Sequence, residues 1–282
     1  MYSLILAIVC SVLISVFMRI GTNRVDSKTG MLASNYACCI IIGAISAAAG
    51  GSGFSALSAN PAVPLMLLFA VINGSLFLGA FLLLQANIRK NGVVLSTTFS
   101  KLGLLVPMVV SIFLFKEIPT FVQIIGFVIA IFSIIFMNKN DGKGSKASAA
   151  GLIILLLACG SADTMSKIYD ELGDPSLSSL YLLFSFAVSL LFCLFIVLIK
   201  KEKLGRKELI YGFLLGIPNY FSVHFMLGSL ATVPAVIVYP TYSVATILFV
   251  SLAGVLIFHE KLEKRQWFIL GAILVAVALL NM

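Results

Sequence analysis

The sequence predicts an all-α integral membrane protein of ten transmembrane helices, arranged as two inverted repeats of five helices each. Three observations lead to this prediction: the composition is strongly apolar, apolar runs recur along the chain, and the fourth and ninth runs can be aligned. Of the 282 residues, 61% are hydrophobic and only 11% are charged. Soluble domains carry roughly 25% charged residues, so this chain could not cover itself with polar surface in water. We therefore expect lipid to surround most of it.

A transmembrane helix needs about 20 apolar residues, and ten runs approach this length. They cover residues 2–20, 31–50, 64–88, 93–115, 119–137, 150–169, 177–199, 208–228, 234–257 and 266–281. The runs are continuous rather than alternating, which favours helices over an outer-membrane barrel. No basic residue precedes the first run and no small-residue cleavage site follows it. We expect a retained first span rather than a signal peptide.

The polar loop after the fifth run, with the sequence NKNDGKGSKAS, divides the chain into two halves. We expect residues 1–140 to form the first five-helix repeat, 141–148 the linker, and 149–282 the second repeat. Because five is an odd number, the second half enters the membrane from the opposite side, which makes the repeat inverted. Inverted repeats are typical of secondary transporters, whose solute site lies near the membrane midplane between the repeats.

An alignment of the fourth and ninth runs supports this division. Asn91–Glu117 aligns with Pro234–Glu260 without a gap, and six of the 27 positions are identical. Both segments end in Phe-x-Glu, and a glycine-containing last span follows each. Neither Glu117 nor Glu260 lies deep in a span, so we expect both to fix turns between helices rather than to bind a solute.

Basic residues collect in alternate loops. The odd-numbered loops, counted along the chain, hold fifteen lysines and arginines, whereas Lys116 is the one basic residue in the even-numbered loops and the termini. Basic loops remain on the cytoplasmic side of a membrane. This bias predicts cytoplasmic odd loops and extracytoplasmic termini, in a multi-pass protein of the cell (plasma) membrane.

The chain resembles the drug/metabolite transporter superfamily, specifically its ten-helix EamA-like members. The resemblance is carried by Phe115-Lys116-Glu117 with Gln123 and Gly126 behind it, and by Phe258-His259-Glu260 with Gln266 and Gly271. It implies a helix bundle with a central cavity that works by alternating access. The implied function is secondary active transport of a small polar or amphipathic metabolite, amino-acid-like or drug-like. Familiar members often carry a tryptophan early in the first and sixth spans and keep their termini inside. Here the single tryptophan is Trp267, and the charge bias places the termini outside.

Two charged residues inside spans are the first candidates for solute binding, because such charges are costly in lipid. Lys101 lies ~12 Å into the fourth span, and its repeat mate is Val244, so the fold itself does not require a charge there. Lys101 could anchor a carboxylate or phosphate, or it could extend to the cytoplasmic interface or be paired internally. Asp163 could couple a proton or bind an amine, or it could pair with Lys167 one turn later.

Uncharged polar and aromatic residues complete the substrate-binding candidates. His224 could titrate near neutral pH or simply hydrogen-bond within the bundle. Asn219 and Asn73 could line a cavity or join helices. The remaining candidates lie in the fourth, eighth and ninth spans and could line a pocket, although core packing alone explains the aromatic ones equally well: Phe99, Ser100, Tyr220, Tyr239 and Tyr242.

No nucleotide-binding loop, catalytic triad or metal-ligand spacing stands out in the sequence. We expect no enzymatic activity, no cofactor and no metal. The expected partners are a small-molecule solute, the lipid bilayer, and a coupled proton or counter-solute, with no nucleic acid, and the chain would act as a monomer or homodimer. Two alternatives stay open: a flippase for a lipid-linked headgroup, and a non-transporting membrane scaffold subunit.

Overall fold

Helices make up the secondary structure of the residues that the computed structural model describes, which are 2–49, 60–106, 110, 120–138, 146–230, 235–260, 262, 264–280 and 282. The α-helices are α1 (Tyr2–Arg24), α2 (Lys28–Ala49), α4 (Val63–Lys101), α6 (Phe121–Asn138), α7 (Lys146–Leu172), α8 (Ser178–Ile199), α9 (Arg206–Leu230), α10 (Ala235–Leu256) and α11 (Lys264–Leu280). Two short 3-10 helices, η1 (Leu102–Leu104) and η2 (Pro175–Leu177), follow α4 and precede α8. Within this part of the chain there is no strand, which confirms the all-α prediction.

Many of these helices are suited to a membrane. Those long and apolar enough to cross one cover Tyr2–Arg24, Lys28–Ser46, Val63–Lys101, Pro175–Ile199 and Arg206–Met226, and shorter apolar helices cover Phe121–Ala130, Ala150–Ser166, Thr241–Leu256 and Trp267–Leu279. Large apolar side chains such as Leu198 and Phe268 are exposed on the outer surface. Water would disfavour such a surface, whereas lipid tails solvate it.

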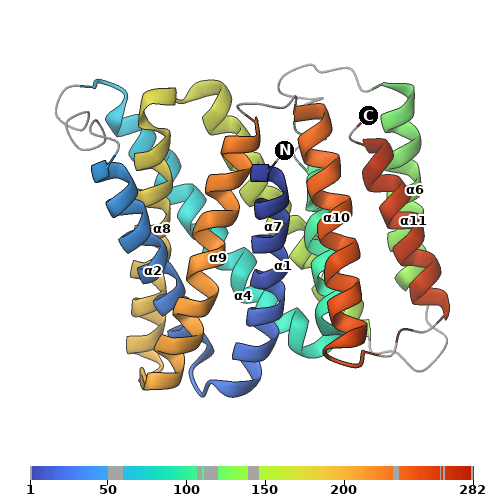
Figure 1. The fold of residues 1–282 in the computed structure, drawn as a ribbon, viewed down its shortest axis with the longest axis horizontal. Helices are drawn as coiled ribbons and strands as arrows, with labels where there is room; N and C mark the ends of the chain where they lie inside the picture. The colour runs from blue at the N-terminus through green and yellow to red at the C-terminus, as the bar shows by residue number, and fades with distance from the viewer. Residues whose placement is uncertain are drawn as a thin grey trace.

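A break at Gly92 divides α4 into the two spans that the sequence predicts there, 64–88 and 93–115. Gly92 has φ 81° and ψ 169°, a conformation that is essentially restricted to glycine. In Figure 1 the first part of α4 descends to the lower end of the bundle, and the chain rises again beyond the break. Residues 107–109 and 111–119, which include most of the end of the fourth predicted span and Glu117, lie outside the described residues.

Helix contacts join the two halves of the sequence. α9 packs against α1 and α2, while α4 packs against α7 and α8. α2 also contacts α8, α4 contacts α10, and α6 contacts α11. Figure 1 shows α6 and α11 side by side at one edge of the bundle, and it shows both chain ends at the upper end. Each of these pairs combines a helix from before residue 140 with a helix from after it.

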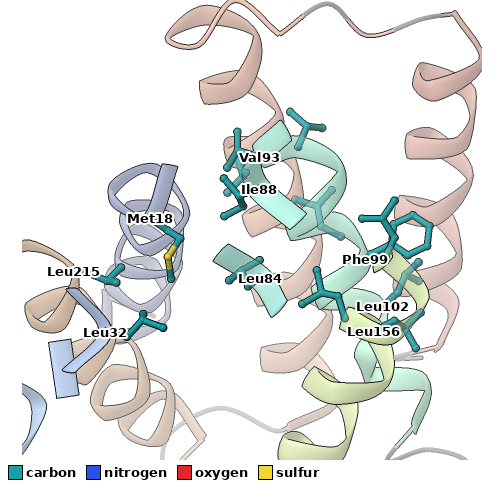
Figure 2. Packing of buried hydrophobic residues seen from close by; sticks show 14 of the residues in the cluster. Met18, Leu32, Leu84, Ile88, Val93, Phe99, Leu102, Leu156 and Leu215 are labelled. Carbon is teal, nitrogen blue, oxygen red and sulfur yellow. The ribbon is translucent and has the colours of Figure 1, made fainter. Parts of the chain in front are cut away.

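A cluster of buried apolar side chains fills the space between the helices. Figure 2 shows part of it, including Met18, Leu32, Leu84, Ile88, Val93, Phe99, Leu102, Leu156 and Leu215. Close helix approach depends on small residues, as is usual in membranes. A Cβ on Gly74 would lie 2.4 Å from the Ser185 carbonyl oxygen, and a Cβ on Gly216 would lie 2.6 Å from the Cys38 Cβ. These glycines bring α4 close to α8, and α9 close to α2.

Candidate functional site

Polar side chains from several helices meet in the interior beside Lys101, the last residue of α4. The Lys101 ammonium lies 4.3 Å from the centroid of the Tyr242 ring on α10, within the range of a cation–π interaction. The Tyr242 hydroxyl is 3.1 Å from the Ser222 hydroxyl on α9. Ser11 of α1 also hydrogen-bonds to Tyr242. Lys101 is therefore held over an aromatic ring that two serines fix in place.

α7 brings a carboxylate and a thiol to the same place. Asp163 and Cys159 are four residues apart and share a helix face. The Ser100 hydroxyl lies 3.2 Å from the Cys159 sulfur, and Asp163 interacts electrostatically with Lys101. We name these seven residues the Lys101 cluster: Ser11, Ser100, Lys101, Cys159, Asp163, Ser222 and Tyr242.

Asp163 retains accessible surface, whereas Ala162 and Thr164 beside it are buried. Its side chain is exposed although it lies well inside α7 and is surrounded by protein atoms. A carboxylate is unfavourable in hydrocarbon and is expected at this depth only where water or a polar partner reaches it. The polar partner found beside it is Lys101.

Four of the ten residues nominated from the sequence belong to this cluster: Ser100, Lys101, Asp163 and Tyr242. The cation beside Asp163 is Lys101 from the other half of the chain. The side chain of Lys167, the alternative partner, lies outside the described residues. Lys101 extends over the Tyr242 ring, so it contacts the protein interior.

Two further nominated residues lie apart from the cluster in a small pocket between α2, α8 and α9. His224 and Tyr220 have nearly parallel rings, with centroids 6.1 Å apart and planes 15° apart. Both line a pocket of about 130 Å³, whose wall also includes Ser46, Ser179 and Phe186. Ser222, between them in sequence, points to Tyr242 instead. α9 therefore presents its polar residues on two different faces.

Asn219 and Asn73 join neighbouring helices. The Asn219 amide donates to Asn35 Oδ1 on α2 at 3.2 Å, and the Asn73 amide donates to Ser185 Oγ on α8 at 3.4 Å. Both asparagines are buried. Their contacts match the helix-joining alternative rather than the lining of an open cavity.

The last two nominated residues are aromatic. Phe99 is 1% exposed and packs in the apolar core, so it does not line a crevice. The side chain of Tyr239 lies outside the described residues, although the α10 backbone there is described.

Sequence reasoning missed three members of the cluster, Ser11, Cys159 and Ser222. Each lies in an apolar span, where a hydroxyl or thiol usually bonds to its own helix or packs. The usable signal was spacing: Cys159 lies one turn before Asp163 on the same face. Among the described residues, no three His, Cys, Asp or Glu side chains gather in a way that could hold a metal ion.

Comparisons with known proteins agree with this architecture. Residues 147–282 match the EamA-like transporter family. An uncharacterized protein of Haemophilus influenzae is 25% identical over 279 residues, which cover 95% of this chain and 93% of that protein. A solved structure, described only as the crystal structure of a protein, shares the fold with a TM-score of 0.65 and 13% identity, over 99% of this chain and 97% of that one. The chain is therefore a multi-pass membrane protein whose residues 147–282 match the EamA-like transporter family, which confirms the resemblance to the drug/metabolite transporter superfamily.

Proposed function

We propose that the protein is a secondary active transporter that moves a small polar or amphipathic metabolite across the cell membrane by alternating access. The observation that carries this proposal is the Lys101 cluster, in which a cation from the first half and an exposed carboxylate from the second half meet inside the bundle. Charges at this depth are maintained only where they serve a solute, an ion or each other.

The helix contacts support an inverted repeat of five helices per half. In an inverted repeat, α1 and α2 would correspond to α7 and α8, α4 to the α9–α10 pair, and α6 to α11. Replacing each helix by its counterpart then reproduces helix contacts that the structure contains. The α1–α9 contact becomes α7–α4, and the α2–α9 contact becomes α8–α4. α2 and α8 each have 22 residues, and Tyr36 contacts Phe186, its counterpart 150 positions later, at 6.2 Å between ring centroids. This pattern favours a two-fold axis in the membrane plane, as in inverted-repeat transporters.

The ends of the bundle then differ in charge. We define the odd-loop end as the end that holds the turn at residues 25–27, the Gly92 break, the loop at 200–205 and the segment at 257–260. Both chain ends lie at the opposite end (Figure 1). Since basic loops stay cytoplasmic, we propose that the odd-loop end faces the cytoplasm of a plasma-membrane protein. A tag after Met282 that is inaccessible from outside intact cells would contradict this orientation.

The chemistry of the cluster favours a solute that carries both charges. Lys101 can bind a carboxylate or phosphate as a compact cation, and Asp163 can bind an ammonium group. The ring of Tyr242 adds an aromatic surface beside the lysine. A zwitterion such as an amino acid would satisfy both charges at once, which offsets the cost of removing them from water. Because the sequence has no nucleotide-binding loop, we expect a proton or a counter-solute to supply the energy.

Transport assays with the purified protein in liposomes test this function. We expect Lys101→Ala and Asp163→Asn each to lower the flux of a transported amino acid at least tenfold, because each removes one of the two charged contacts. Asn219→Ala serves as the control, since its contact joins helices away from the cluster. Flux like that of the unmodified protein in both charge variants, with equal reconstitution, would refute the assignment of the site.

A flippase for a lipid-linked headgroup is the second candidate, and a groove at the lipid-facing surface favours it. The groove has a volume of about 320 Å³ and lies between α1 and α9, the helices that also carry Ser11 and Ser222. Its lining is Cys10, Leu13, Phe17, Leu214, Ile217, Pro218, Phe221 and Phe225. An acyl chain could lie there while its headgroup reached the cluster. Fast scrambling of fluorescent lipids in reconstituted liposomes, with no flux of soluble amino acids, would favour this alternative.

A further inference from the structure

We propose that Glu260 is a reversible tie that closes the odd-loop end of the route to the Lys101 cluster, and that its release opens this end. The inference deepens the proposed transport function and rests on it. It assigns the closing contact to named atoms, the Glu260 carboxylate and the backbone amides of Val93 and Val94.

The break at Gly92 creates the need for such a contact. Val93 and Val94 begin the helical segment that ends at Lys101, so their N–H groups have no acceptor within that helix. Glu260 accepts both: Val93 N donates to Oε1 at 2.7 Å, and Val94 N donates to Oε2 at 3.2 Å. The positive end of the helix dipole strengthens a carboxylate contact at this position. The acceptor belongs to the other half of the chain.

The end of α10 presents the carboxylate. After Leu256 the chain turns back on the helix: Ile257 N donates to the Ala253 carbonyl, and Glu260 N donates to the Gly254 carbonyl at 3.0 Å. His259 has φ 51°, a conformation that closes helices. The tight turn fixes Glu260 directly beside α10, so the carboxylate links α10 itself to α4.

α4 and α10 approach each other closely at this tie. A Cβ on Gly254 would lie 2.3 Å from Val94 Cγ2, and a Cβ on Gly92 would lie 2.7 Å from Glu260 Oε1. At the level of the cluster the same two helices meet through long side chains, Lys101 reaching over the ring of Tyr242. The two helices therefore meet through glycine and a backbone-capping carboxylate at the odd-loop end, and through long side chains at the cluster.

α1 contacts α4 just before the break. Arg19 Nη1 donates to the Ile88 carbonyl oxygen at 2.6 Å, one turn before Gly92. Glu260, which follows α10, and Arg19 of α1 thus both contact the α4 backbone at the break through charged side chains. Hydrogen bonds of this kind can exchange with water at a membrane surface, whereas apolar packing cannot. A reversible closure requires that property.

A second carboxylate at the same end provides a matched comparison. Glu208 of α9 accepts backbone N–H bonds from Asp26 and Ser27 in the other half, at 3.0 and 3.1 Å. It lies between α9 and the turn joining α1 to α2, and both of those helices pack against α9. Glu208 is the same kind of cap, but α9 packs against α1 and α2 far more extensively than α10 packs against α4. We therefore expect its loss to weaken the fold without opening the route.

The native thiol of Cys159 reports access to the cluster. The experiment uses a variant in which Cys10, Cys38, Cys39 and Cys193 are replaced by alanine, reconstituted in liposomes in known orientation. A membrane-impermeant maleimide is applied from each side in turn. We expect Glu260→Ala to raise the labelling of Cys159 from the odd-loop side about tenfold and to lower it from the other side. The tenfold figure corresponds to the free energy of one lost charged hydrogen bond. Glu260→Gln, which keeps one acceptor oxygen, should give a smaller shift, and Glu208→Ala should leave the ratio between sides unchanged.

The proposal is overturned if the ratio of Cys159 labelling between the two sides is unchanged in both Glu260→Ala and Glu260→Gln. Equal increases from both sides also overturn it, because general loosening does not prefer one end. Flux of amino acids through the unmodified protein is measured in the same liposomes. If the ratio of labelling between the two sides shifts but no flux is found, the role of Glu260 stands and the transport function is refuted. If flux is found but the ratio does not shift, the transport function stands and the role of Glu260 is refuted.

Discussion

Replacing Gly92 by alanine tests the physical account of the break in α4. At φ 81° and ψ 169° a residue with a Cβ is strained by about 1–3 kcal/mol. The added Cβ would also lie 2.7–2.8 Å from all three atoms of the Glu260 carboxyl group. Displacing the carboxylate weakens a charge-assisted hydrogen bond worth about 1.5–3 kcal/mol. The two effects together predict a loss of about 2.5–6 kcal/mol in the free energy of unfolding.

Thermal unfolding of the purified protein in detergent measures this loss. For a chain of this size we expect the midpoint to fall by about 5–24 °C. Gly79→Ala is the matched control, because it lies in the same helix and a Cβ there would meet nothing within 4 Å. Alanine in place of an interior helical glycine should stabilise by about 0.5–1 kcal/mol. If Gly92→Ala raised the midpoint as Gly79→Ala does, the account of the break would be wrong.

Three further predictions concern the cluster, a helix contact and a loop. Tyr242→Phe keeps the ring under Lys101 and loses the hydroxyl beside Ser222, so transport should stay within a fewfold of normal, whereas Tyr242→Ala should lower it at least tenfold. Asn219→Ala removes one interhelical hydrogen bond and should destabilise by about 0.6–1.7 kcal/mol in thermal unfolding while transport persists. The hydrogen bonds from Asn60 and Ser176 lower the pKa of Asp174 in the loop before η2. That stabilisation is present above the unfolded pKa of about 3.9 and is lost as the pH falls through the folded value; acidification should thus lower the unfolding midpoint less in Asn60→Ala than in the unmodified protein.

The positions of the helices follow from the sequence, because they depend on local properties. Apolar runs of the required length, separated by polar residues, predicted where the described helices lie. The boundary between 64–88 and 93–115 coincides with the break at Gly92, where asparagine and glycine follow two basic residues. The use of Glu260 at a turn was also expected, although it caps the turn between the third and fourth spans rather than the one that follows its own helix.

The grouping of the site residues was harder to predict, because it depends on how each helix is rotated about its axis. Lys101 and Asp163 were found because a charge in a span is conspicuous at any rotation. His224 and Ser222 are only two residues apart, yet one lines the pocket beside Tyr220 and the other contacts Tyr242. When every face of a helix is apolar enough for lipid, the sequence gives no strong signal of which face turns inward. Tertiary contacts decide this.

The tie at the Gly92 break also bears on how the protein is made. Val93 and its acceptor Glu260 are separated by 167 positions in the chain. The third and fourth spans are therefore synthesised long before Glu260, which caps the turn between them. Until then, water or lipid headgroups must accept the hydrogen bonds of the Val93 and Val94 N–H groups. The turn can reach its final form only when nearly the whole chain has been synthesised, so the first half depends on the second for its own local structure. Expressed as two separate polypeptides, the halves would have to meet in the membrane before either could finish folding.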